Sequence, residues 1–182
     1  MKVQVVPPDP SWKDQFDAEA KSIRSALGEA FVRIHHIGST SIPNIYAKPV
    51  IDILLEVSDV KDLDNRTAAL IALGYEAKGE FGIPGRRYFR KNSGEGVRTH
   101  QIHAFESDGE GLVRHLAFRD YMIAHPELAR AYSDLKRRLA SVYPDDIEAY
   151  MDGKDPFIKE HEQIALRWRT AGPSSITGTD RR

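Results

Sequence analysis

Apolar residues recur along this chain at two different spacings, and the two spacings predict different elements. In residues 12–27 the apolar positions Trp12, Phe16, Ile23 and Leu27 are typical of a helix with one buried face. Residues 50–57 are instead dominated by Ile, Val and Leu in a short run, which predicts a strand near the centre of a sheet. The first half of the chain is therefore expected to contain a long amphipathic helix and, after it, a buried strand.

The remaining pattern predicts further strands, followed by helices. The expected strands are Val3–Val6 at a sheet edge, Phe31–Ile37, Tyr75–Lys78, Arg86–Lys91 and Arg98–Phe105, with a hairpin turn at 92–96 joining the last two. The expected helices are Lys61–Leu73, Leu112–Ala124, Pro126 to about Val142, and Asp145 to about Thr170, with a break at Gly153 or Pro156 left open. This order predicts an α+β fold with a mixed sheet of about five strands and flanking helices, rather than a doubly wound sheet.

Length and composition narrow the class of protein. At 182 residues we expect a single domain over 1–171, with a sheet core at about 1–106, a helical part at about 110–170 and a disordered tail at 172–182. A net charge of −1 argues against general nucleic-acid binding, and the absence of cysteine excludes disulfides and thiolate metal sites. Without an apolar signal region or a membrane-spanning run, we expect a soluble cytoplasmic protein with no membrane partner.

Candidate chemistry begins at the turn formed by Gly38, Ser39, Thr40 and Ser41. A glycine and small hydroxyl residues allow backbone amides to approach a phosphate closely, and Lys48 follows as a cation. The alternative interpretation is an ordinary strand-to-helix turn with a serine cap. The dipeptide alone does not decide between them, because no established phosphate-loop pattern is present.

Two carboxylates, Asp52 and Glu56, interrupt the most apolar strand. A buried carboxylate is costly unless it is paired or binds a metal, so both are candidate catalytic and metal-binding residues. Their separation is about 13 Å at the rise of a strand, so they cannot reach one ion unaided. The alternative is that Asp52 bonds the turn backbone while Glu56 lies at a solvated strand end.

Later segments add a histidine and a basic strand. His103 shares a strand face with Gln101 and is a candidate metal ligand or general base, or else a histidine bonded to a neighbour. Arg86 and Arg87 are candidate phosphate ligands, because a guanidinium matches phosphate oxygens, although a solvated strand face is the alternative. We interpret the run Lys136–Arg138, on a predicted helix, as a solvated face.

Several motifs together resemble one family. They are HIGSTSIPNIYAKPVIDI, GIPGRRYFRK, THQIHAF, and FRDYMIAHPELARAYSDLK followed by YMDGKDPFIKE. In this order, over roughly residues 8–168, they resemble the GrpB family of the nucleotidyltransferase superfamily. The resemblance implies a nucleotidyltransferase-like fold in which a Gly-Ser turn precedes acids that hold a divalent metal, most often Mg²⁺, on an NTP. Asp52 matches the first acid, but Leu54 stands where the second would be, and Gln101 stands where the family usually has a histidine.

Three functions remain open. The first is a metal-dependent nucleotidyltransferase that moves an NMP group from an NTP to an unidentified acceptor. Asp52, Glu56 and His103 would be its catalytic and metal-binding residues, with Mg²⁺, Mn²⁺ or Zn²⁺ as cofactor. Its phosphate ligands would be Gly38, Ser39, Thr40, Lys48, Arg86 and Arg87. The second is a catalytically silent module that binds a nucleotide or a coenzyme A-type phosphate, which the lost acid at Leu54 favours. The third is a structural or interaction protein.

Overall fold

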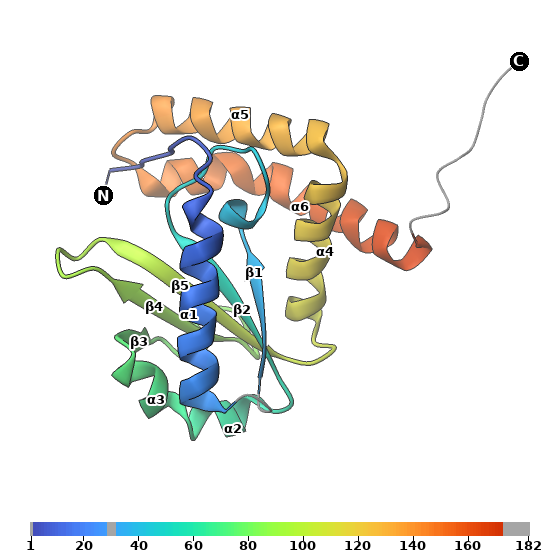
Figure 1. The fold of residues 1–182 in the computed structure, drawn as a ribbon. Coiled ribbons are helices and arrows are strands. Elements are labelled where there is room, and N and C mark those ends of the chain that lie inside the picture. Colours follow the sequence, from blue (N-terminus) through green and yellow to red (C-terminus); the bar gives the residue numbers. More distant parts are fainter. Residues whose placement is uncertain (1, 29–31, 173–182) are drawn as a thin grey trace, which may run out of the picture.

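The computed structural model of this chain describes residues 2–28 and 32–172, and it has one mixed sheet flanked by helices (Figure 1). The five strands are β1 (Val32–Ile37), β2 (Ile51–Val57), β3 (Tyr75–Ala77), β4 (Arg87–Asn92) and β5 (Arg98–Glu106). They lie in the order β1-β2-β5-β4-β3, and β2 and β5 pair in parallel while the other neighbours are antiparallel. The α+β fold with about five strands is thus confirmed.

Helices cover the sheet on both sides. They are α1 (Ser11–Leu27), the 3₁₀ turn η1 (Ser39–Ser41), α2 (Val60–Asp64), α3 (Thr67–Ala72), α4 (Glu110–Ala124), α5 (Pro126–Val142) and α6 (Ile147–Ala171). The buried face of α1, including Trp12 and Ile23, packs on one side of the sheet against Ile53 and Ile102. On the other side, Leu116 of α4 packs in a smaller cluster with Leu54.

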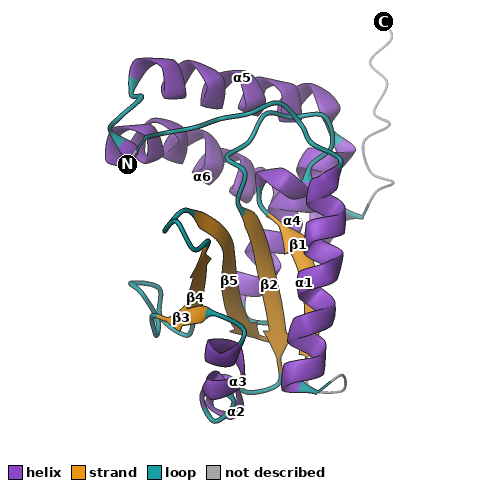
Figure 2. Ribbon diagram, turned by 60° about the vertical axis from the view of Figure 1, so that its left-hand side comes forward, coloured by secondary structure: helices purple, strands orange, loops and turns teal. Residues whose placement is uncertain are grey.

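The last two helices, α5 and α6, lie together at one end of the sheet, as Figures 1 and 2 show from two directions. Their core includes Ala129 and Tyr132 of α5 and Ala165 of α6, and it also takes in Ile42 and Ile45 from the loop between β1 and β2. This packing brings α5 and α6 over the loop that contains the Gly-Ser turn. None of the helices within 2–28 and 32–172 combines the length and the apolar character needed to cross a bilayer.

Several predicted boundaries were wrong, each for a local reason. Val3–Val6 is not a strand: in the described part of the chain only one isolated bridge, Val6 to Ala47, forms before prolines end the pairing. The helix expected at 61–73 is two short helices, because the chain turns at 65–66. The sequence left open whether the last helix breaks at Gly153 or Pro156, and α6 continues through both. The expected strand start at Phe31 lies outside the described residues, and so does the expected tail 172–182 from residue 173 onward.

Candidate functional site

The Gly-Ser turn lies directly against the Asp52 carboxylate. In the antiparallel register Ile37 at the end of β1 pairs with Asp52 near the start of β2, so Gly38 follows beside that side chain. Gly38 has φ +70°, and a Cβ placed on it would lie 2.9 Å from Cβ and Cγ of Asp52 and closer still to Oδ2. Only glycine fits here, both in conformation and in space.

The rest of the turn is held by its own hydrogen bonds. The Ser41 hydroxyl donates to the Gly38 carbonyl at 2.6 Å, and the Thr40 hydroxyl donates to the Val50 carbonyl at 3.4 Å. Thr40 is buried, and its hydroxyl also lies 2.9 Å from Nε2 of His36. The structure therefore places Thr40 as a support of the turn, whereas Ser39 faces a cavity.

That cavity has a volume of about 220 Å³ and lies between the turn, the sheet and the last two helices. It brings together four of the predicted site residues, Ser39, Lys48, Asp52 and His103. Its other lining residues are Val50, Gln101, Lys136, Tyr150, Met151 and Lys154. Two of these, Lys136 of α5 and Lys154 of α6, are cations that our sequence interpretation did not place in any site.

Positive groups outnumber negative ones in this cavity. Asp52 is the only carboxylate among its described lining residues, against three lysines. Burial lowers the pKa of Lys154 to about 8, although the nearby Asp52 opposes this shift. Burial also lowers the pKa of Lys136 to about 7, and that of Lys48 falls for the same reason. The protein thus holds several ammonium groups where water solvates them poorly.

Lys136 was wrongly interpreted as part of a solvated face. It is 1% exposed, and its ammonium donates to the Tyr46 carbonyl at 2.5 Å and lies 4.5 Å from the centre of the Tyr132 ring. A signal for this existed in the sequence, because Ala129, Tyr132, Lys136 and Leu139 follow one another at helical spacing on a single stripe. Lys136 lies on the buried stripe, while the neighbouring Arg137 lies off it.

His103 connects the cavity to the basic strand. Its Nε2 lies 3.8 Å from Oδ1 of Asp52, and its Nδ1 lies 3.5 Å from a guanidinium nitrogen of Arg86. The imidazole of His115, on α4, lies 5.4 Å away between ring centres, and burial lowers its pKa to about 4. His115 is therefore neutral at pH 7 and adds no positive charge beside His103.

The structure does not bring three other predicted residues into the cavity. Arg86 is buried and donates to the carbonyls of Glu80 and Phe81 at 3.1 and 2.6 Å. Arg87 points to the other face of the sheet, where it forms a two-pronged ion pair with Asp64 at 2.6 and 2.8 Å.

The third is Glu56, near the far end of β2. Its carboxylate contacts Arg33 at 3.1 Å, His35 at 3.0 Å and Ser107 at 3.2 Å. Between Asp52 and Glu56 lies Leu54, which is fully buried in an apolar cluster. Glu56 thus has its own polar partners at a strand end, but it is not solvated as the alternative interpretation expected, because its side chain is only 11% exposed.

The donor set of the cavity does not fit a resident divalent metal. Mg²⁺ prefers several oxygen ligands, and Zn²⁺ sites typically use three or four protein ligands. Here one carboxylate and one imidazole stand among three lysines. Within 2–28 and 32–172, no three His, Cys, Asp or Glu side chains gather closely enough to hold a metal ion.

Comparison with known proteins identifies relatives of this chain. A family model described as "GrpB protein" matches residues 2–163. The UPF0157 protein YqkA of Bacillus subtilis (strain 168) is 45% identical over 168 residues, covering 92% of this chain but only 48% of YqkA. A dephospho-CoA kinase of Mycolicibacterium paratuberculosis is 29% identical over 191 residues, covering 91% of this chain and 46% of the kinase. The chain therefore spans about half the length of either relative.

Two solved structures support the fold. Conserved protein GrpB from Enterococcus faecalis superposes with a TM-score of 0.84 at 42% identity, over 90% of this chain and 98% of that protein. The Cid1 poly(U) polymerase in its MgGTP-bound structure superposes with a TM-score of 0.53 at 14% identity, over 75% of this chain and 44% of Cid1. The likeness to Cid1 shows a nucleotidyltransferase-like fold and nothing about activity.

Proposed function

Because the chain belongs to the GrpB family, which shares its fold with nucleotidyltransferases, we propose that it binds the phosphate groups of a nucleotide in the cavity beside Asp52. Ser39 and the ammonium groups of Lys48 and Lys154 would be the phosphate ligands. The observation that carries this proposal is the excess of lysines over carboxylates in a small, poorly solvated cavity.

The physical argument is one of charge compensation. Lysines in this cavity lose hydration on burial and, to a smaller extent, repel one another, which is why their pKa values fall. A bound phosphate would offset both costs, because charge-assisted hydrogen bonds to phosphate oxygens are short and strong. In this arrangement the lysines provide the positive charge that a metal ion provides in sites with several carboxylates.

Calorimetric titration of the protein with inorganic tripolyphosphate and with ATP, in EDTA and in Mg²⁺, tests the proposal. We expect wild type to bind both ligands in EDTA, without any divalent metal. We expect Lys154→Met to lower the affinity for each ligand at least tenfold. The matched control is Lys159→Met on the same helix, because Lys159 is exposed and pairs with Asp155 at 2.6 Å. Equal affinity of wild type and Lys154→Met would refute the assignment. Coenzyme A and dephospho-CoA belong in the same series, given the relative named dephospho-CoA kinase.

The second candidate is nucleotidyl transfer from an NTP to an acceptor hydroxyl, with release of pyrophosphate. It is favoured by the 3.8 Å approach of Asp52 and His103, which sets a carboxylate and an imidazole beside the Ser39 turn. The test is pyrophosphate release from each NTP with Mg²⁺, Mn²⁺, Zn²⁺ or no metal, in the presence of candidate acceptors. Release that persists in Asp52→Asn would exclude this role for Asp52.

A further inference from the structure

An exposed phenylalanine, Phe81, packs on a buried tyrosine, Tyr88, which contacts two lining residues of the phosphate cavity. The Phe81 ring stacks on Tyr88 with ring centres 5.0 Å apart and planes inclined by 17°. Phe81 is nevertheless 59% exposed, so much of this residue remains open to solvent. Exposure of a large ring that is already stacked on one side is costly in water, and it is typical of a platform that receives a second planar group.

The backbone of this loop is held in a strained conformation that presents the ring. Phe81 has φ +45°, a region that bulky residues rarely adopt. Arg86 fixes it by donating to the Phe81 carbonyl at 2.6 Å and the Glu80 carbonyl at 3.1 Å. The Glu80 carboxylate in turn accepts from the Gly85 amide at 2.7 Å. The loop is therefore organised around the position of Phe81.

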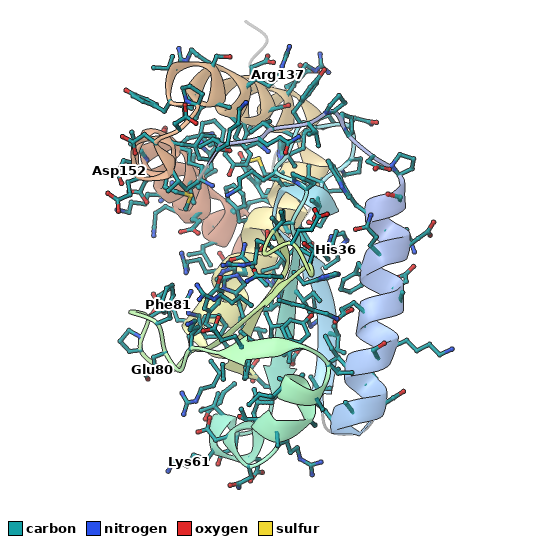
Figure 3. All side chains as sticks on the ribbon, turned by 90° about the vertical axis from the view of Figure 1, so that its left-hand side faces the viewer. His36, Lys61, Glu80, Phe81, Arg137 and Asp152 are labelled. Carbon is teal, nitrogen blue, oxygen red and sulfur yellow. The ribbon has the colours of Figure 1, made fainter. Side chains whose placement is uncertain are left out.

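Tyr88 links this platform to the cavity. Its hydroxyl donates to the side-chain oxygen of Gln101, and its ring lies 5.3 Å from the His103 ring between centres. Both Gln101 and His103 line the cavity. The sequence of rings thus runs from the cavity wall outward to Phe81, and Figure 3 shows Phe81 on the outer loop, on the same side of the molecule as Asp152 of α6.

We infer that Phe81 is a stacking platform for the nucleobase of the ligand whose phosphates occupy the cavity. The inference rests on the proposed function and adds a subsite to it. Stacking accepts any base, since every base has a π-face. The ligand class is therefore a nucleotide or a coenzyme that contains a nucleobase, rather than an inorganic or sugar phosphate.

The test compares two ligands, ATP and tripolyphosphate, in wild type and four variants. In Phe81→Ala we expect ATP to bind about tenfold more weakly while tripolyphosphate binds as in wild type, and Phe81→Trp should retain ATP affinity. Lys154→Met should weaken both ligands. Val97→Ala is the matched control, because Val97 is 60% exposed on the β4–β5 hairpin. Circular dichroism and the thermal midpoint verify that each variant is folded.

The outcomes separate the two proposals. Unchanged ATP affinity in folded Phe81→Ala would overturn the platform while leaving phosphate binding intact. An equal loss for ATP and tripolyphosphate would also overturn it, because Phe81 would then act through the shape of the loop. Failure of wild type to bind tripolyphosphate would overturn the phosphate site itself, and the platform with it if ATP also failed to bind.

Discussion

At the start of β2 the Asp52 carboxylate occupies the space in which a side chain at position 38 would lie. This contact explains at the level of single residues why the turn needs glycine. The position of the turn is therefore tied to a packing requirement, because Gly38, which precedes Ser39, lies directly against Asp52. Residues that support the turn, such as Thr40, matter for the site without facing it.

We predict that Gly38→Ala lowers the free energy of unfolding by about 2–4 kcal/mol, the sum of overpacking and of a backbone penalty, because φ +70° with ψ −174° is a conformation essentially confined to glycine. Denaturant unfolding measures it. Gly79→Ala is the control, because Gly79 has φ +61° but open space around it, so only the backbone penalty of about 1 kcal/mol applies. Equal losses in the two variants would show that the contact with Asp52 is unimportant.

A second residue-scale prediction concerns pH. The pKa of Lys154 falls from 10.5 to about 8 in the folded protein, so the unfolded chain holds the proton more tightly. The free protein should therefore gain stability as the pH rises from about 8 towards 10.5, while phosphate affinity falls as the lysine loses its charge. Thermal midpoints and tripolyphosphate titrations between pH 7 and 10 measure both trends.

The cost of burying the charged Lys154 ammonium also predicts the effect of replacing this residue. Lys154→Met should raise the stability of the free protein at pH 7 by about 1 kcal/mol, discounted because the side chain is only half-buried. This gain should shrink by pH 10. A loss of stability in Lys154→Met at pH 7 would mean that the lysine has a compensating partner in the folded state.

At the scale of elements, adjacent arginines of one segment serve opposite faces of the sheet. Arg86 is directed at the 80–85 loop, whereas Arg87, the first residue of β4, pairs with Asp64 at the end of α2. The strand pleat separates the two side chains, so their roles differ although their chemistry is the same. Neither arginine lines the cavity.

We predict that Arg86→Gln speeds amide hydrogen exchange in the 80–85 loop by at least tenfold, because two backbone carbonyls lose their donors. Arg87→Gln should leave that loop unchanged and cost less than about 1 kcal/mol, since its ion pair is partly exposed. Exchange measured by mass spectrometry distinguishes the two variants. Equal protection of the loop in both would contradict the role given to Arg86.

At the scale of the molecule, the cavity exists because the C-terminal helices cross the end of the sheet. Its lining comes from η1, the loop after it, β2, β5, α5 and α6. Since both halves of the chain build the site, we propose that residues 1–171 form one domain. The loop residues Ile42 and Ile45, which are buried among α4, α5 and α6, support this proposal.

The fluorescence of two tryptophans can test whether residues 1–171 form one domain. Trp12 of α1 is buried against the sheet, and Trp168 of α6 is part of the helical cluster. Each of the variants Trp12→Phe and Trp168→Phe retains one tryptophan, whose fluorescence follows urea unfolding. We predict that in each variant the fluorescence and the circular dichroism give the same unfolding midpoint. A fluorescence midpoint that differs from the circular dichroism midpoint of the same variant would indicate that the sheet and the C-terminal helices unfold as two units.

Local periodicity and motif order determined the elements of this protein, its α+β class and its family resemblance, because each depends on neighbours in the sequence. The strand rise alone already indicated that Asp52 and Glu56 could not share one ion. Tertiary structure decided which polar residues meet. In the folded chain Lys136 and Lys154 line the cavity, whereas Arg86 and Arg87 do not, and Phe81 stacks on Tyr88, whose ring lies near that of His103. Those outcomes depend on helix rotation, strand pairing and loop closure between distant segments, which no local pattern encodes.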